Sequence, residues 1–416
     1  MRFNRREALA LGASGLLVPR KVLAQPGFER KFLFVFCPGG WDQCYLFAPL
    51  FDSSSVDMEP NAERAEVNGI TFVDSNEKEN VRAFFEDYGQ KTCMINGFES
   101  RSVAHDVCLR LVCTGSSLPA GDDWPSIIAA HSALDPIMPL VSLSGPLYSH
   151  NYGSTIVRVG EAGQLAQLLD GSAFGQSDHP VPAPPASAEA LQDGWLQELT
   201  AQRAQQAARG RAQEIVTMAA DSEERLKRLQ DMGGELDLGS GRNLGESLNL
   251  AADILEFGSS RCVMVGYDGA QNLGWDTHAG SFLQAIHLNE LFNELGMLMR
   301  QLNWRSGSEG RKLSDEVTVV VMSEMGRFPQ ENSRGGKEHW TYTSCLLVGS
   351  GVRGGRTIGA YDDLCFGRKI DLSSGELAEN GEDLVPGHVG ATLLALADID
   401  PAAHLDEEPI LAAVDL

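Results

Sequence analysis

The chain has little positive charge, no long uncharged apolar run and no closely paired cysteines. It carries 33 Lys and Arg residues against 57 Asp and Glu residues, a formal net charge of −24. A chain this acidic repels phosphate backbones and anionic headgroups, which excludes DNA, RNA and anionic lipid surfaces as partners. No segment offers the roughly 20 apolar residues of a membrane-spanning helix. The sequence therefore predicts no transmembrane helix.

The eight cysteines are scattered and form neither a CxxC pair nor a dense disulfide framework. We expect Cys37, Cys262 and Cys345 to be buried strand residues, because each lies within or at the end of a continuous apolar run. Bridges among the other cysteines are open, since their spacing assigns no pairs.

The N-terminus has the three parts of an export signal. Three arginines within residues 2–6 precede an apolar run over residues 8–18, and a small-residue cleavage site ends at Ala24. Paired arginines favour the twin-arginine route for folded proteins, and the alternative is an ordinary secretory signal. We expect residues 1–25 to be a signal peptide and the translocase to be a partner during export. Residues 26–416 would then act in the periplasm or outside the cell, with no membrane anchor after cleavage.

Short apolar runs bounded by glycine and proline predict buried strands of a parallel sheet. They lie at residues 31–37, 91–95, 261–266, 317–322 and 344–348. Apolar spacing of three and four predicts helices between these strands. These helices lie at residues 81–88, 103–112, 283–302 and 389–396. Alternation of strands and helices predicts an α/β fold, a three-layer sandwich with a mostly parallel central sheet.

A helical arm is predicted as an insertion into this fold over about residues 180–245. Residues 188–229 are rich in Gln, Ala, Arg, Glu and Leu and contain few helix breakers. This composition favours a solvated helical face without chemistry of its own.

Polar side chains follow several predicted strands, at the sheet edge where open α/β proteins bind their ligands. Asp42 follows the first strand, Asp276 and His278 follow the 261–266 strand, and Glu324 and then His339 follow the 317–322 strand. Ser100, Ser102 and His105 follow the 91–95 strand. Carboxylates and imidazoles are the donors that Zn²⁺ or Mn²⁺ prefers, so their recurrence predicts a divalent metal site.

Each candidate ligand also has a purely structural interpretation. Asp276 could cap a helix beginning near Ser281, His278 could be a hydrogen-bonded core imidazole, and Asp42 could stabilise its own turn. A serine at the helix start could likewise be an N-cap. Recurrence of such residues at successive strand ends favours the metal site.

The motifs GGWD, GWDTH, SEMGR and GGKEHW resemble one known family. So does a predicted helix that starts with S-x-x-H and ends in Thr114-Gly115. This is the bacterial exported family called domain of unknown function 1501. The family is similar in fold to the superfamily of alkaline phosphatase, sulfatase and cofactor-independent phosphoglycerate mutase. The resemblance spans residues 30–400 or so and implies an alkaline phosphatase-like fold.

The resemblance implies a metal centre with a serine nucleophile. Its implied metal ligands are Asp42, Asp276, His278, Glu324 and His339, and its implied nucleophile is Ser102 or Ser100, with His105 binding metal or moving protons. Two-metal enzymes of the superfamily have an Asp-His pair where this chain has Glu324-Met325. A thioether is a poor ligand for such ions, so one metal is expected rather than two.

These residues predict a metal-dependent hydrolase of phosphate or sulfate esters, on a small-molecule or polymer substrate. The nucleophile would attack phosphorus or sulfur, while Arg327, Arg101 or Lys337 binds the remaining ester oxygens. The alternative is a non-catalytic exported binding protein that keeps the fold and one structural metal. The Glu324-Met325 pair is the feature that favours this alternative.

Overall fold

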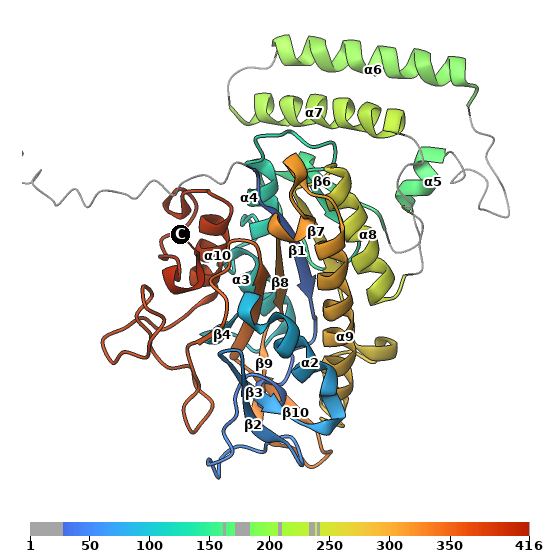
Figure 1. Ribbon diagram of the computed structural model, residues 1–416. Coiled ribbons are helices and arrows are strands. Elements are labelled where there is room, and N and C mark those ends of the chain that lie inside the picture. The colour runs from blue at the N-terminus through green and yellow to red at the C-terminus, as the bar shows by residue number, and fades with distance from the viewer. Residues whose placement is uncertain are drawn as a thin grey trace, which may run out of the picture.

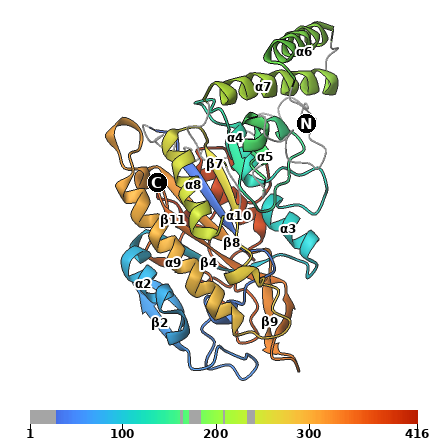
Figure 2. The same ribbon diagram turned by 90° about the vertical axis from the view of Figure 1, so that its right-hand side faces the viewer.

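The computed structural model describes residues 28–160, 164–170, 184–206, 210–232, 238 and 242–415. The predicted signal peptide, residues 1–25, lies outside the described residues. Within them, one large sheet has helices on both faces, as Figure 1 and Figure 2 show. The predicted α/β sandwich is therefore confirmed.

The central sheet has eight strands in the order β12-β4-β11-β8-β1-β7-β5-β6. Their bounds are β1 Lys31–Phe36, β4 Thr92–Glu99, β5 Leu140–Ser142, β6 Ile156–Arg158, β7 Cys262–Gly266, β8 Val317–Met322, β11 Tyr342–Gly349 and β12 Arg356–Ile358. Two small antiparallel sheets accompany it. They pair β2 Glu63–Val67 with β3 Ile70–Asp74, and β9 Gly326–Glu331 with β10 Lys337–Trp340.

One predicted strand has a different direction from its neighbours. The 344–348 run forms β11, but β11 pairs antiparallel with both β8 and β4, whereas the other pairings in the central sheet are parallel. The chain leaves β8 and returns through the β9–β10 hairpin, without a crossover helix. Parallel pairing requires such a crossover, so the short return makes β11 antiparallel.

Helices cover both faces of the sheet and enclose two hydrophobic cores. One face packs on α2 Glu79–Tyr88, α8 Leu244–Phe257 and α9 Leu283–Trp304, and the other on α3 His105–Thr114, α4 Trp124–Ala130 and α10 Pro386–Leu396. The central strand β1 contributes to both cores. Leu33 and Val35 lie in the first core, while Phe32, Phe34 and Phe36 lie in the second. Alternate side chains of a strand point to opposite faces, so a continuous apolar run is what a doubly covered strand requires.

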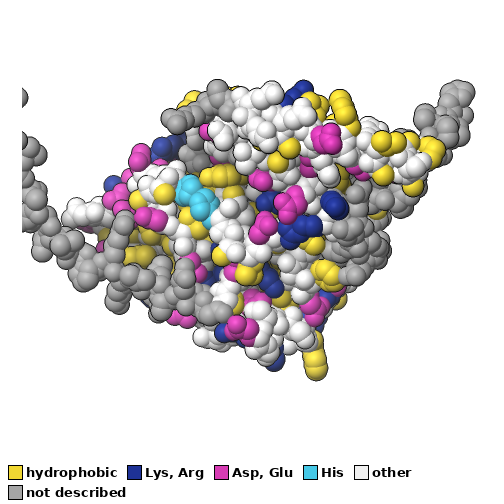
Figure 3. Space-filling model, turned by 90° about the horizontal axis from the view of Figure 1, so that it is seen from above, with side chains coloured by type: hydrophobic (Ala, Val, Ile, Leu, Met, Phe, Trp, Pro, Cys, Tyr) yellow, Lys and Arg dark blue, Asp and Glu magenta, His cyan; other side chains and the backbone are white. Residues whose placement is uncertain are grey.

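Two further helices, α6 Ala186–Gln206 and α7 Arg211–Met232, form a hairpin that projects from one end of the molecule (Figure 1). No residue of α6 is buried. Arg225 and Arg228 of α7 form ion pairs of 3.2 and 3.1 Å with Asp135. Figure 3 looks onto this end and shows acidic, basic and hydrophobic side chains interspersed. Short α5, Gln164–Asp170, precedes the hairpin.

No helix within the described part of the chain combines the length and apolar character needed to cross a bilayer. Cys37, Cys262 and Cys345 are fully buried, as their apolar surroundings in the sequence predict.

Strand register brings distant segments together at the carboxyl edge of the sheet. Phe36 of β1 pairs with Gly266 of β7 on one side and with Met322 of β8 on the other. The segments that follow these three strands therefore begin side by side, which sets up the site described below.

The packing of α9 gives a test of the fold. Phe292 is 1% exposed and contacts the rings of Phe84 and Phe85 at 5.2 and 5.4 Å between centroids. Replacing Phe292 with Ala should lower the free energy of unfolding by about 3–5 kcal/mol, because it removes a buried ring and leaves a cavity. Phe282, which is 63% exposed, is the matched control and should change stability by less than about 0.5 kcal/mol. Equal urea midpoints for the two alanine variants would contradict this packing.

Candidate metal centre

Four side chains from three regions of the chain meet at the carboxyl edge of the sheet. The Nε2 atoms of His278 and His339 each lie 3.1 Å from Asp276 Oδ1. These two Nε2 atoms are 3.0 Å apart. His105 Nε2 lies 3.5 Å from the other carboxylate oxygen, Asp276 Oδ2. His105, Asp276 and His339 present ligand atoms that all lie within 4.8 Å of one another.

Local structure brings each of these donors to the sheet edge. Asp276 and His278 lie on the turn after β7, where the Trp275 indole donates to Tyr267 O and His287 Nε2 lies 2.9 Å from Gly274 O. His339 is on β10, and His105 is the first residue of α3. The donors thus come from a turn, a strand and a helix start.

The second nitrogen of each imidazole faces an acceptor. His105 Nδ1 lies 2.8 Å from Glu324 Oε1, and His339 Nδ1 lies 2.7 Å from the carbonyl of Val103. His278 Nδ1 is 2.8 Å from Glu338 Oε2, although the two groups are not aligned for a hydrogen bond. When Nδ1 carries the proton, a neutral imidazole has its lone pair on Nε2. His105 and His339 therefore have the arrangement of metal-binding histidines, whose outer nitrogen donates to a carboxylate or carbonyl.

Three Nε2 lone pairs and one carboxylate facing each other repel unless a cation lies among them. In an ideal tetrahedron with Zn–N bonds of about 2.0–2.1 Å, donor atoms are about 3.3–3.4 Å apart. The four separations that join Asp276 to the imidazoles and His278 to His339, 3.0–3.5 Å, are close to this value. The group whose ligand atoms all lie within 4.8 Å of one another is His105, Asp276 and His339. A proton shared between His278 and His339 is the metal-free explanation of their short contact. The approach of His105 to Asp276 has its own metal-free explanation, an ion pair with a protonated imidazole.

Arg327 holds this edge together, and its role differs from the predicted one. Its side chain is completely buried and its Nη2 donates to Asp276 Oδ1 at 2.6 Å. The same guanidinium also donates to four backbone carbonyls, those of Gly39, Gly40, Trp275 and Lys337. All three nitrogens are therefore engaged, although Nη1 has one acceptor for its two N–H groups, and the side chain is not exposed to substrate. This geometry favours a positioning role for Arg327 over the predicted oxygen clamp.

Arg327 also sets the charge state of the central ligand. Partial burial raises the pKa of Asp276, but the hydrogen bond from Arg327 outweighs it and lowers this pKa to about 2. Asp276 is therefore a carboxylate at any pH near neutrality. At the same site, a hydrogen bond to Glu324 raises the pKa of His105 above its ordinary value.

The two glycines of GGWD permit this close packing. Gly39 and Gly40 have φ of +120° and +85°, which disfavour side chains. A Cβ at Gly39 would lie 2.8 Å from Asp276 N, and one at Gly40 would lie 2.8 Å from Met325 Cγ. The first-strand turn can therefore lie directly against the GWDTH and SEMGR segments.

Asp42 is one of the predicted ligands. Among the described residues, it makes no contact with the imidazoles of the site. Its Oδ1 accepts a 2.8 Å hydrogen bond from Cys44 N, and its Oδ2 forms a 2.9 Å ion pair with the buried Lys337. Burial lowers the pKa of Lys337, but the Asp42 carboxylate outweighs this and raises it overall. Asp42 thus stabilises its own turn, the simpler of its two interpretations. Lys337 in turn has no charge free for substrate oxygens.

Glu324 contacts the candidate ligand His105, but it makes no contact with Asp276, His278 or His339 among the described residues. Its Oε1 lies 2.8 Å from His105 Nδ1 and accepts a 2.8 Å hydrogen bond from Gly39 N, while its Oε2 accepts from Ser323 Oγ. Both oxygens are thus occupied within a fully buried side chain. Glu324 orients His105.

Neither predicted nucleophile caps α3. The cap residue is Ala104, and it makes no side-chain hydrogen bond. Ser100 is fully buried and its hydroxyl donates to Thr341 O at 2.8 Å. Ser102 is half-buried, and its Oγ accepts a 3.1 Å hydrogen bond from Ala104 N. Ser102 also directly precedes Val103, whose carbonyl orients His339.

Sequence reasoning missed Glu338 and Val103, which contact the outer nitrogens of His278 and His339. Glu338 was within the GGKEHW motif, directly before His339, so its position was a usable signal. Val103 acts through its backbone carbonyl, for which the side-chain sequence gives no signal.

Fold and donor set together define an α/β sandwich protein with a candidate metal centre at the carboxyl edge of its sheet. The chain belongs to the family described as protein of unknown function (DUF1501), which matches residues 29–380. The family resemblance of the motifs is thereby confirmed. No curated protein sequence matches the chain.

Several solved structures are similar in fold. A sulfatase from Pseudoalteromonas sp. matches with 8% identity and a TM-score of 0.38, over 100% of this chain and 80% of the sulfatase. A phosphonate monoester hydrolase from Silicibacter pomeroyi matches with 11% identity and a TM-score of 0.40, over 93% of this chain and 78% of the hydrolase. A protein in the alkaline phosphatase superfamily from Vibrio parahaemolyticus has 11% identity and a TM-score of 0.36, over 93% and 70%. Similarity at this level assigns no activity to this chain.

The positioning role of Arg327 predicts a stability effect in metal-free protein. Replacing Arg327 with Met should lower the free energy of unfolding by at least about 3 kcal/mol, because buried carbonyls and Asp276 lose their donor. Arg334, whose side chain is 63% exposed, is the matched control and should change stability by less than about 0.5 kcal/mol as Met. Urea unfolding measures both. An R327M variant of unchanged stability would instead favour a guanidinium that is free to bind substrate.

Proposed function

We propose that the chain is an exported divalent-metal-dependent hydrolase that acts on phosphate or sulfate esters. The observation that carries the proposal is the meeting of three imidazole Nε2 atoms at the Asp276 carboxylate, with separations of 3.0–3.5 Å. Paired arginines ahead of a short apolar run, within residues 1–25, support export by the twin-arginine route and work in the periplasm or beyond.

In this proposal His105, Asp276, His278 and His339 hold one ion, Zn²⁺ or Mn²⁺. Neutral imidazole and carboxylate oxygen suit both ions. A single site is favoured because Asp42 is neutralised by Lys337. When bound, the ion supplies positive charge to the ester oxygens and activates an adjacent hydroxyl or water.

Ser102 is the proposed nucleophile. Its hydroxyl is half-buried, and a hydrogen bond from Ala104 N would stabilise negative charge on the oxygen during attack. Attack forms a bond from Ser102 Oγ to phosphorus or sulfur and breaks the bond to the alcohol, which leaves with the proton of the serine hydroxyl. Water then cleaves the serine ester, returning one hydrogen to Ser102 and leaving OH on the released phosphate or sulfate. Ser100 is the weaker candidate, because its buried hydroxyl already donates to Thr341 O.

Arg101 is the proposed contact for the remaining ester oxygens. It directly precedes Ser102, and its side chain is exposed, unlike those of Arg327 and Lys337. Its backbone has φ of +56°, a strained conformation that is found often at functional sites. A planar guanidinium can bind two oxygens of a phosphate or sulfate at once.

A non-catalytic exported binding protein with one structural metal is the second candidate. The Glu324-Met325 pair favours it, because a full two-metal hydrolase of this superfamily would have an imidazole at the second position. The two candidates share the metal and differ in turnover, so hydrolysis of aryl phosphate and aryl sulfate esters by metal-loaded mature protein separates them.

Metal content tests the proposed ligands. Elemental analysis of the mature protein should find about one equivalent of zinc or manganese, and His339→Ala should lose it. Glu324→Gln should keep the ligands but bind the ion about 10–100-fold more weakly, because the carboxylate that orients His105 is lost. His131→Ala, an exposed histidine beside His404, should bind as the parent does. Retention of a full equivalent by His339→Ala would refute this ligand set.

Activity tests the proposed nucleophile. Ser102→Ala should lose turnover of whichever aryl ester the parent hydrolyses by about 10³-fold or more while keeping the metal. Ser116→Ala, a half-buried serine after α3, is the control and should retain both. Full turnover by Ser102→Ala would move the assignment to Ser100 or to direct attack by water.

A further inference from the structure

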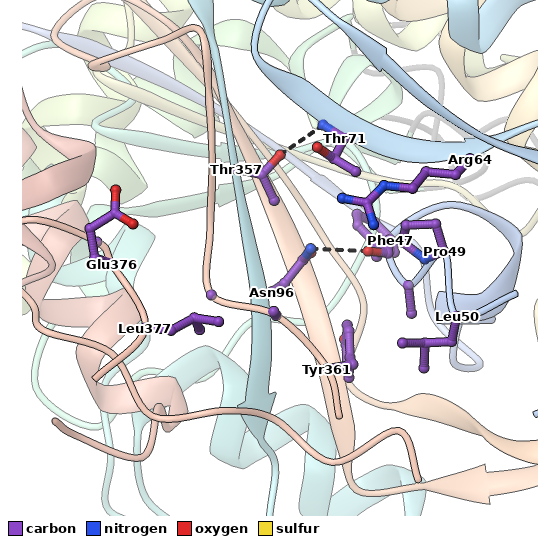
Figure 4. A pocket seen from close by; sticks show the side chains of 14 residues that line it. Phe47, Pro49, Leu50, Arg64, Thr71, Asn96, Thr357, Tyr361, Glu376 and Leu377 are labelled. Carbon is purple, nitrogen blue, oxygen red and sulfur yellow. Dashed lines mark hydrogen bonds between the residues drawn. The ribbon is translucent and has the colours of Figure 1, made fainter. Parts of the chain in front are cut away.

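A cavity of about 310 Å³ lies away from the metal centre, at the β12 edge of the central sheet. It is enclosed by the turn after η1 (Gln43–Tyr45), the β2–β3 hairpin, β4, and the segment that follows β12. Figure 4 shows side chains from these four regions around one space. None of the four proposed metal ligands lines it.

Asn96 of β4 is the buried polar group of this cavity. Its side chain is only 3% exposed, and its Nδ2 donates to Phe47 O at 3.0 Å. Its Oδ1 has no hydrogen-bond partner among the residues that the structure describes. An unpaired buried acceptor costs about 1–3 kcal/mol, a cost that a donor brought by a ligand would recover.

A bulge in the sheet gives Asn96 its orientation. The pairing of β4 with β11 shifts register between Phe98 and Asn96, and the intervening Gly97 has φ of +76°. Bulges of this kind redirect side chains and recur beside binding sites.

Two opposite charges and an apolar surface complete the cavity. Arg64 of β2 and Glu376 lie on different sides of Asn96 in Figure 4, and both line the cavity. Both side chains are exposed, and neither has an ion-pair partner among the residues that the structure describes. Leu50 and Leu377 supply aliphatic surface beside them.

We propose that this cavity binds a small zwitterion, an α-amino acid with an aliphatic side chain. Its carboxylate would pair with Arg64, and its ammonium group would donate to Asn96 Oδ1 and face Glu376. The side chain would lie against Leu50 and Leu377. A cavity of about 310 Å³ is at the small end of the usual range for ligand pockets, which suits a ligand of this size. The proposal is independent of any hydrolase activity.

Titration calorimetry with L-leucine and the full mature protein tests the proposal. We expect saturable binding of L-leucine. The analogue without the ammonium group, 4-methylpentanoate, and the analogue without the carboxylate, 3-methylbutylamine, should each bind at least about tenfold more weakly. Tenfold corresponds to the loss of one charged contact of roughly 1.4 kcal/mol. Absence of saturable leucine binding, or equal binding of the three compounds, overturns the proposal.

Surface variants locate the binding site without disturbing the fold. Arg64→Gln and Glu376→Gln change exposed side chains, and each should weaken leucine binding at least about tenfold at an unchanged urea midpoint. Glu379→Gln is the matched control, since Glu379 is an exposed carboxylate three residues from Glu376 that does not line the cavity. Leucine binding that is equally strong in all three variants overturns the assignment to this cavity.

Discussion

The buried guanidinium of Arg327 is the interaction on which the candidate metal centre depends. It joins the turn after β1, the turn after β7 and strand β10 through four backbone carbonyls, and it fixes the Asp276 carboxylate at 2.6 Å. A buried charge is tolerated when it is paired and its donors are satisfied, and here every nitrogen of the guanidinium has at least one acceptor. The ligands that follow β7 and those on β10 are positioned relative to one another by this one side chain.

A second buried ion pair, between Lys337 and Asp42, explains why Asp42 does not join the other predicted ligands, although it also follows a strand. Lys337 lies on the same strand as His339 but binds Asp42, so the first-strand carboxylate is neutralised locally. The two buried cations therefore divide the carboxylates between them. Arg327 holds Asp276 among the imidazoles, and Lys337 keeps Asp42 in its own turn. One carboxylate and three histidines are therefore left together, a candidate donor set for a single divalent ion.

Much of the architecture could be predicted from the sequence, because buried strands and amphipathic helices leave regular apolar patterns. The strands β1, β4, β7 and β8 and the helices α2, α3, α9 and α10 all correspond to predicted segments within a few residues. The direction of β11 could not be predicted from its apolar run, because direction depends on the connection before it. The short strands β5, β6 and β12 have only three residues each, too few to show a period.

The sequence predicts which types of residue gather at the site. It predicts the role of each residue less well. Strand ends identify which side chains gather at one edge, and His105, Asp276, His278 and His339 do gather there. Whether a carboxylate faces the centre or an adjacent lysine depends on side-chain packing, which sequence spacing does not reveal for Asp42. The same holds for Arg327, whose five acceptors come from segments far apart in the chain.

X-ray absorption at the zinc edge, on mature protein loaded with one equivalent of zinc, tests the central claim most directly. Three imidazole nitrogens and one carboxylate oxygen at about 2.0–2.2 Å are the expected ligand sphere. A sphere with fewer than two imidazoles, or zinc that binds equally well after Asp276 is changed to Asn, would contradict a metal centre built on Asp276 and its histidines.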